Sequence, residues 1–298
     1  MKDIYGDGEM TNKVYDIVTE QILNLLDQGV VPWHQEWDAL AGMPQNIDSK
    51  RPYSGFNLMY LWFLQKIQGW SLPYYLTYNG ARKHGWHVRK GEKGNLVVFW
   101  KVYQKAVKND FTGKDEEKQA RVLRYYYLFN LAQIDGWTEA DLPKKNEIEQ
   151  LPTCENLINS FVAGLPEIKD GASPVYVPSK DIIYLPPITS YNESEYFYSS
   201  RFHETVHSTG AKKRLGRPGV VDPVNFGSEK YSLEELVAEI GAAFLSAMSG
   251  ISGKVLEHNA SYIQTWHSKL KENPTWIVKA ASQAQKAVNY LLQKEASQ

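Results

Sequence analysis

The chain of 298 residues contains a single cysteine, Cys154, which excludes an intrachain disulfide and fits a reducing cytoplasm. We expect that thiol to be a small buried hydrophobe and not a metal ligand. No apolar run reaches the roughly 18 residues of a transmembrane helix, so we expect no membrane partner. The first residues lack the basic and apolar regions of a signal peptide. Repeats, low-complexity segments and phosphate-loop signatures are also missing, which leaves a globular chain long enough for two domains.

The net charge of the chain is only −1, but its charged residues are unevenly distributed. Residues 80–124 contain 12 Lys or Arg and 5 Asp or Glu, a local charge of +7, and the rest of the chain is therefore at −8. Asymmetry of this kind predicts one domain that faces a polyanion.

The most informative stretch is His-Glu-Thr-Val-His at residues 203–207. At 3.6 residues per turn, His203 and His207 share one helix face and can direct two imidazoles to one metal ion. This HExxH arrangement supplies two zinc ligands and a general base, which is Glu204. Zinc lowers the pKa of its bound water to about 7, and the carboxylate takes the proton as the water attacks a carbonyl.

A third protein ligand is expected from a helix over residues 232–245. Glu235 and Glu239 are four residues apart and share a face, where carboxylates among alanines are costly unless they meet a cation. We assign Glu235 to the metal and Glu239 to the orientation of a histidine ligand. The alternative is that Glu234 and Glu235 merely cap the helix and favour its positive end.

The ends of both site helices can be predicted from capping residues. Ser190 with Glu193 has the spacing of a capping box before the HExxH helix, and Gly210 is a suitable stop. Ser232 with Glu235 has the same spacing at the start of the second helix.

The amino-terminal half reads as a mixture of helices and strands. Helices are expected at residues 11–28, 57–68 and 77–84, and an antiparallel pair of strands at 97–103 and 121–129. Nothing in the first helix points to catalysis.

Residues 51–103 hold 13 of the 38 aromatic residues. Aromatic rings interleaved with cations suit single-stranded nucleic acid, because bases stack on the rings and cations track the phosphates. Most of the rings are expected in the core, Phe99 and Tyr126 among them, whereas Trp86 in a basic turn is expected to stack on bases. The predicted DNA-binding residues are Arg82, Lys83, Trp86, Arg89, Lys90 and Lys93.

The expected division is a first domain at residues 1–135, a polar linker at 136–152 and a second domain at 153–298. In the second domain, short strands at 175–177 and 182–185 precede the metal motif, and such an edge strand can pair with an extended peptide. Helices are expected at 153–164, 257–272 and 275–295.

These motifs resemble a known family. HETVH followed by EELVAEIGAAF resembles the zincin-like metallopeptidase domain of the antirestriction ArdC family, which shares this pattern with the gluzincins. Residues 174–186 and 260–266 are similar to the same domain. Residues 51–57 and 91–94, with the strand that follows, resemble the amino-terminal domain of the family.

The resemblance implies an α+β protein of two domains, an α+β domain that binds single-stranded DNA and a mostly helical zincin-like domain with one zinc ion. It implies that the protein protects incoming plasmid DNA from host restriction during conjugation, with restriction enzymes or another protein as substrate. Two alternatives stay open. One is a regulatory zinc protease that cleaves a repressor or host protein and uses DNA for localisation. The other is a binding protein whose structural metal fills all four ligand positions.

Overall fold

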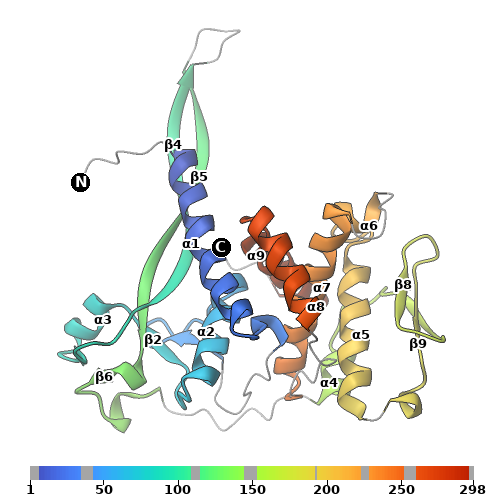
Figure 1. Ribbon diagram of the computed structural model, residues 1–298, viewed down its shortest axis with the longest axis horizontal. Coiled ribbons are helices and arrows are strands. Elements are labelled where there is room, and N and C mark those ends of the chain that lie inside the picture. Colours follow the sequence, from blue (N-terminus) through green and yellow to red (C-terminus); the bar gives the residue numbers. More distant parts are fainter. Residues whose placement is uncertain are drawn as a thin grey trace.

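The computed structural model describes residues 7–34, 43–108, 115–143, 153–191, 193–222, 228–251 and 260–294 (Figure 1). The fold is α+β, with a mixed sheet in the amino-terminal half and a largely helical carboxy-terminal half, as predicted.

The amino-terminal half combines helices with a four-stranded sheet of order β1-β2-β5-β4. Its helices confirm the predicted ones within a few residues. The elements are α1 (Asp7–Asp27), η1 (Pro32–His34), β1 (Gln45–Asn46), α2 (Gly55–Ile67), β2 (Tyr74–Leu76), α3 (Tyr78–Lys83), β3 (His87–Val88), β4 (Asn95–Lys108), β5 (Asp115–Asn130), η3 (Leu131–Gln133), β6 (Ile134–Asp135) and η4 (Glu139–Asp141).

Strands β4 and β5 form the predicted antiparallel pair, in a register that runs from Asn95↔Leu128 to Lys108↔Asp115. The hairpin runs beside α1, and its far end projects beyond that helix (Figure 1). Phe99 is 41% exposed, so its prediction as a core residue is wrong. Tyr126 is partly buried and packs against a small cluster around Leu61 and Tyr75, as predicted.

Trp86 is the second residue whose predicted location is wrong. Its side chain is 5% exposed and packs in a cluster with Leu131 and Ile134. Strand β3, which follows Trp86 directly, pairs with β6, and the ring of His84 stacks on the indole at 4.3 Å between centroids. The basic turn therefore has an apolar centre, and Trp86 is not available for stacking on a base.

The carboxy-terminal half places helices against a three-stranded sheet of order β7-β9-β8. Strands β8 and β9 are those predicted from the sequence. The elements are α4 (Cys154–Asn159), β7 (Glu167–Asp170), β8 (Val175–Val177), β9 (Ile182–Leu185), η5 (Ile188–Ser190), α5 (Ser194–Thr209), α6 (Pro218–Val221), α7 (Glu229–Met248), α8 (Ala260–Glu272) and α9 (Trp276–Leu291).

Two predicted helix starts differ from the structure. Helix α5 begins at Ser194, four residues after Ser190. Helix α7 begins at Glu229, where the side chain of Ser228 accepts a hydrogen bond from the Tyr231 backbone N–H. Gly210 does follow the last residue of α5 as its C-cap.

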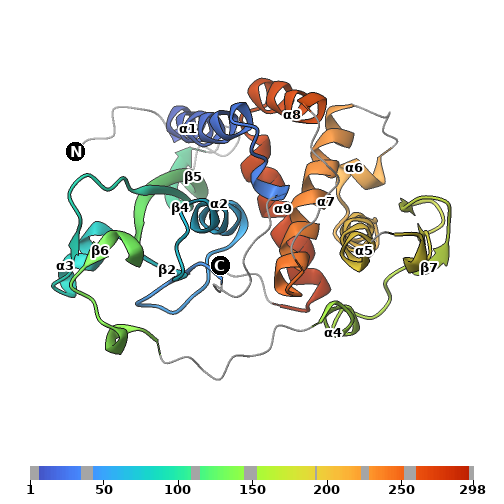
Figure 2. The same ribbon diagram turned by 60° about the horizontal axis from the view of Figure 1, so that its bottom comes forward.

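One hydrophobic core crosses the predicted domain boundary. Helix α1 lies along α8, and α2 packs on α9 (Figure 2). The Gly55 N–H donates to Gln285 Oε1 at 3.1 Å, and Thr19 Oγ1 donates to the Pro274 carbonyl at 2.6 Å. The predicted linker lies mostly outside the described residues. Among the described helices, none combines the length and apolar character that a membrane span requires.

Candidate metal centre

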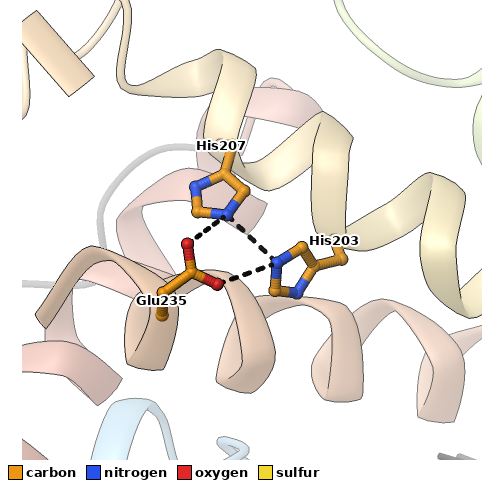
Figure 3. Close-up of side chains that lie close together, drawn as sticks. All are labelled: His203, His207 and Glu235. Carbon is orange, nitrogen blue, oxygen red and sulfur yellow. Dashed lines mark hydrogen bonds and ion pairs between the residues drawn. The ribbon is translucent and has the colours of Figure 1, made fainter. Parts of the chain in front are cut away.

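Helices α5 and α7 cross closely and bring three predicted ligands together (Figure 3). Nε2 of His203 lies 3.0 Å from Nε2 of His207. The Glu235 carboxylate lies 3.5 Å from each of these nitrogens, through Oε2 to His203 and Oε1 to His207. The three side chains are partly exposed, so one side of the triangle faces the cavity described below.

The size of this triangle fits a tetrahedral metal ion. Ligand atoms about 2.1 Å from a common tetrahedral centre lie about 3.4 Å apart. The observed separations of 3.0 to 3.5 Å bracket that value. Two imidazoles and a carboxylate are also a donor set that suits a divalent transition metal. His203, His207 and Glu235, which the spacing predicted as ligands, therefore form a candidate metal site.

A small residue on α7 permits the close crossing. A Cβ added at Gly241 would lie 2.8 Å from Cγ2 of Val206, which belongs to α5 between the two histidines. Ala238 and Ala242 are also buried on α7. The helices approach closely enough for a Glu on one to meet His on the other because these positions have little or no side chain.

The carboxylate that orients His207 is Glu234. Its Oε1 lies 3.1 Å from Nδ1 of His207, the ring nitrogen that does not face the metal position. The prediction gave this role to Glu239, but Oε2 of Glu239 accepts a hydrogen bond from the Trp33 indole at 3.0 Å. The prediction for Glu239 is corrected accordingly.

Glu234 is held in place by a buried guanidinium. Nε and Nη2 of Arg217 donate to its two oxygens at 2.8 and 2.7 Å, and both residues are 5% exposed. Arg217 also donates to Thr209 Oγ1 and to the Val206 carbonyl in α5. A buried charge pair of this geometry fixes the position of the carboxylate and, through it, the ring of His207.

These contacts set the protonation of the ligands in the absence of metal. Burial by itself lowers the pKa of His207, but its hydrogen bonds with Glu234 and Glu235 outweigh burial and raise the pKa to about 10. Burial opposes ionisation of Glu235, yet the two histidines hold the pKa of this carboxyl well below its usual range. The carboxylates are therefore ionised and His207 is protonated near neutral pH.

Glu204, the predicted general base, lies beside the triangle and is 8% exposed. Its Oε2 accepts a hydrogen bond of 2.7 Å from the Tyr176 backbone N–H in β8. This contact holds the carboxylate of Glu204 at the cavity that the three candidate ligands also line.

A polar network fixes β8 in turn. The Tyr176 hydroxyl donates to Asp181 Oδ1 at 2.7 Å, and Nη2 of Arg214 contacts both groups. Nε of Arg214 donates to the Ser208 carbonyl at 2.6 Å, just beyond His207. The hairpin that holds Glu204 is thus tied to the end of the helix that carries the ligands.

Strand β8 is an edge strand, as expected, but its free edge offers few donors. Tyr176 directs its N–H toward Glu204, so the positions two residues away face the same side of the ladder. Those positions are Pro174 and Pro178, which have no N–H. An extended peptide could therefore bond to this edge mainly by donating to its carbonyls.

The site opens into a cavity of about 920 Å³. Glu204, the three ligands and Tyr231 form its polar wall, and the Tyr231 hydroxyl hydrogen-bonds Glu235. The cavity is also lined by apolar residues, which include Pro174, Val175, Val220 and Val221, and by the charged residues Lys212 and Asp222. A cavity of this size takes an extended segment or a side chain.

The predicted DNA-binding cations lie elsewhere, on α3 and the turn after it. Lys90 and Lys93 are exposed, as are Arg82 and Lys83, and within the described ranges none of the four has an ion pair. Arg89 differs, because it donates to Glu92 at 2.9 Å, to Asp135 at 3.4 Å and to the Ala132 carbonyl. Its guanidinium is paired with two carboxylates, which leaves Arg82, Lys83, Lys90 and Lys93 as the candidate phosphate contacts.

Fold and site together define a zincin-like metallopeptidase domain joined to a second, mixed α/β half. Comparison with known proteins agrees. Residues 152–283 match the family described as zincin-like metallopeptidase, and residues 12–129 match the N-terminal domain of anti-restriction factor ArdC. The chain belongs to the ArdC family of antirestriction proteins.

Several known proteins are similar to this chain over nearly its whole length. The uncharacterized protein y4eC of Sinorhizobium fredii (strain NBRC 101917 / NGR234) is 32% identical over 93% of this chain and 91% of its own length. DNA primase TraC of Escherichia coli is 31% identical over 95% of this chain, which spans 20% of TraC.

Two solved structures of the antirestriction ArdC protein from plasmid R388 are also similar. The metal-free and Mn(II)-bound forms each have a TM-score of 0.71, with 94% of this chain and 96% of theirs covered, at 32% and 29% identity. One of these relatives is therefore a protein with bound Mn(II), and in this chain His203, His207 and Glu235 form the candidate metal site.

Proposed function

We propose that this protein is an antirestriction factor that binds single-stranded DNA through its amino-terminal half and hydrolyses a protein substrate at a zinc site in its carboxy-terminal half. It would act on incoming plasmid DNA in the cytoplasm during conjugation. The observation that carries the peptidase part is the triangle of His203, His207 and Glu235, with Glu204 beside it in an open cavity.

A divalent ion on these ligands would supply Lewis acidity, which polarises a carbonyl oxygen and makes a water molecule more acidic. Residues of the protein itself would transfer the proton and hold the reacting groups in position. Glu204 accepts a proton from the attacking water and returns it to the leaving amide nitrogen. The Tyr176 N–H keeps the carboxylate oriented for both transfers. Glu234 holds the ring of His207 so that its Nε2 faces His203 and Glu235, where it would bind the ion.

Zinc is the metal we propose, and its test is direct. Protein purified without added metal should contain about one zinc ion per chain, and His203→Ala or His207→Ala should remove it. The Mn(II) in the R388 relative makes manganese the relevant competitor. Stoichiometric manganese, or zinc retained by both variants, would overturn the assignment.

Proteolysis is tested with the metal-loaded protein, type I and type II restriction enzymes, and a Glu204→Gln control that keeps the ligands. We expect cleavage of at least one restriction component by the wild type and none by the control. The alternative of a repressor-cleaving protease predicts instead that the restriction subunits stay intact. The family's occurrence in part of a DNA primase favours a DNA-associated role for either substrate.

DNA binding rests on the exposed cations of α3 and the following turn, within the +7 stretch. Phosphate contacts release counterions, so affinity for an oligonucleotide should fall with salt by about −0.7 in log–log slope per contact. Lys90→Gln with Lys93→Gln should reduce that slope by about 1.4 and weaken all sequences about equally. Arg89→Gln is the matched control, because its guanidinium is already paired with two carboxylates. Equal slopes for the wild type and the double variant would remove the two lysines from the interface.

A further inference from the structure

The β4–β5 hairpin carries several large aromatic side chains in contact with solvent. Tyr127 is 49% exposed, Tyr125 40% and Trp100 47%, and Tyr78 at the start of α3 is 52% exposed. With Phe99, the amino-terminal half has five exposed aromatic rings among the described residues. Aromatic residues usually dominate cores, so exposed rings that gather on one surface indicate a ligand that rings can bind.

These rings lie on one face of the hairpin. Tyr125 and Tyr127 are two residues apart on β5, which places them on the same side about 6.6–6.8 Å apart along the strand. Trp100 shares that side, because its neighbour two residues away, Val98, is paired with Tyr125. The centroids of Tyr125 and Tyr127 are 5.8 Å apart with nearly perpendicular planes.

The row continues toward α3. Phe129, the next residue on this side of β5, lies 6.5 Å from Tyr78 between ring centroids. Beneath the row is Gly94, where an added Cβ would lie 2.7 Å from Cβ of Tyr127. Any side chain at this position would displace Tyr127, so the glycine keeps the ring in place.

Cations flank the row at both ends. Lys93 directly precedes Gly94, and Arg82 and Lys83 occupy the last turn of the helix that Tyr78 begins. Arg121 is exposed on β5, four residues before Tyr125 and on the same side. Positive charge beside exposed rings complements a ligand that has phosphates and accessible bases.

We propose that the row of Tyr78, Tyr127, Tyr125 and Trp100 is the surface on which bases of single-stranded DNA stack, while the flanking cations hold the phosphates. This inference rests on the proposed DNA-binding function and specifies its contact surface. Duplex DNA binds more weakly there, because its bases are already stacked on one another and present only edges in the grooves.

The test uses the full chain and fluorescein-labelled oligo(dT) of about 20 nucleotides, with fluorescence anisotropy at several salt concentrations. Tyr125→Ala and Tyr127→Ala should each weaken binding by about 5- to 150-fold, at an unchanged salt slope. The matched control is Phe99→Ala. Phe99 is 41% exposed on the same hairpin, but it is paired with Arg124 on the opposite side, so its loss should leave binding unchanged.

Two further variants separate stacking from folding. Tyr127→Phe keeps the ring and should bind as the wild type does, whereas Tyr127→Leu keeps apolar bulk without a ring and should bind as weakly as Tyr127→Ala. A thermal melt of each variant identifies any that unfold.

The outcomes distinguish a failure of the proposed DNA-binding function from a failure of the proposed stacking surface. If the folded wild type does not bind the oligonucleotide at low salt, the proposed DNA-binding function fails. If it binds and the Tyr125 and Tyr127 variants bind equally well, the function stands and the stacking surface is wrong. Equal losses for Phe99→Ala and Tyr125→Ala would also overturn the assigned face.

Discussion

The buried pair of Glu234 and Arg217 makes a sharp prediction about the metal site. Glu234→Gln removes the negative charge whose oxygen lies 3.1 Å from Nδ1 of His207. The amide that replaces the carboxylate has a similar size and keeps one oxygen. Groups that orient a metal ligand typically contribute about 10- to 100-fold to metal affinity. We therefore expect the zinc affinity of this variant to fall by that factor, or about 1.4–2.7 kcal/mol.

Three glutamates on α7 allow a matched comparison. Glu235→Gln removes a ligand and should weaken zinc binding more than Glu234→Gln does. Glu239→Gln removes a carboxylate that bonds to Trp33, so it should leave affinity close to that of the wild type. Competition with a chromophoric chelator at constant pH measures all four proteins.

Stability must be measured alongside affinity. Breaking a buried ion pair costs about 3–5 kcal/mol, because the remaining charge stays buried. The amide oxygen of Gln can still accept one bond from Arg217, so the loss for Glu234→Gln should lie near the lower end. Denaturant melts of the metal-free variants show the range in which each is folded. Wild-type affinity for Glu234→Gln together with a tenfold loss for Glu239→Gln would refute our correction and restore the sequence-based assignment.

Four further outcomes are expected. Glu204→Gln should retain zinc and lose about 10²–10⁴-fold in turnover, measured on any substrate that the wild type cleaves. Zinc binding at pH 8 should release about one proton, because His207 with its pKa near 10 must lose its proton; calorimetry in buffers of different ionisation enthalpy measures this. Trp86→Ala should destabilise the fold by about 3–5 kcal/mol in denaturant melts. A protease site inserted between Pro143 and Thr153 should give two pieces that co-elute in size-exclusion chromatography, because they share one core.

For each of these four predictions, one result would contradict it. Full turnover in Glu204→Gln would remove that carboxylate from proton transfer. A binding heat that does not depend on buffer would mean that His207 is neutral before metal arrives. A stable Trp86→Ala protein that has lost DNA binding would return Trp86 to the interface. Separate elution of the two cleaved pieces would mean that each half folds independently.

The sign of the pH effect follows from the shifted pKa. In the metal-free protein, protonated His207 between Glu234 and Glu235 stabilises the fold fully below the unfolded pKa of about 6.5. That contribution is lost as the pH rises toward about 10. Metal affinity changes in the opposite direction and rises with pH, since the ion and the proton compete for the same nitrogen.

Local pattern was enough to predict which three residues meet at the candidate metal site. Helical spacing alone places His203 and His207 on one face, and the i, i+4 relation on α7 singled out Glu235. The partner of His207 could not be found this way. Glu234 is one position from Glu235, about 100° around the helix, and it contacts the histidine because α5 crosses α7 and Arg217 holds it from a separate loop.

Contacts between residues far apart in the sequence also explain the wrong predictions in the amino-terminal half. Trp86 stands among cations in the sequence, yet contacts with residues more than forty positions later bury it. Phe99 lies in an apolar run that suggests a buried strand, but it is 41% exposed, because the cluster around Leu61 and Tyr75 that buries Val97 on the same side does not include it. In the carboxy-terminal half, Ser190 and Ser232 have good capping spacing, but Ser190 belongs to the short helix η5, and the Ser228 side chain caps α7 earlier in the chain.

The shared core connects the two functional halves physically. Trp33, which follows α1, is fully buried and donates to Glu239, one turn along α7 from the ligand Glu235. Its ring also packs edge-on against Trp266 of α8 at 6.0 Å. Truncation near residue 135 would leave these contacts unsatisfied and expose the faces of α1 and α2 that pack on α8 and α9. DNA binding and metal chemistry are therefore best measured on the whole chain, because loss of either in a fragment would report on the core as much as on the site.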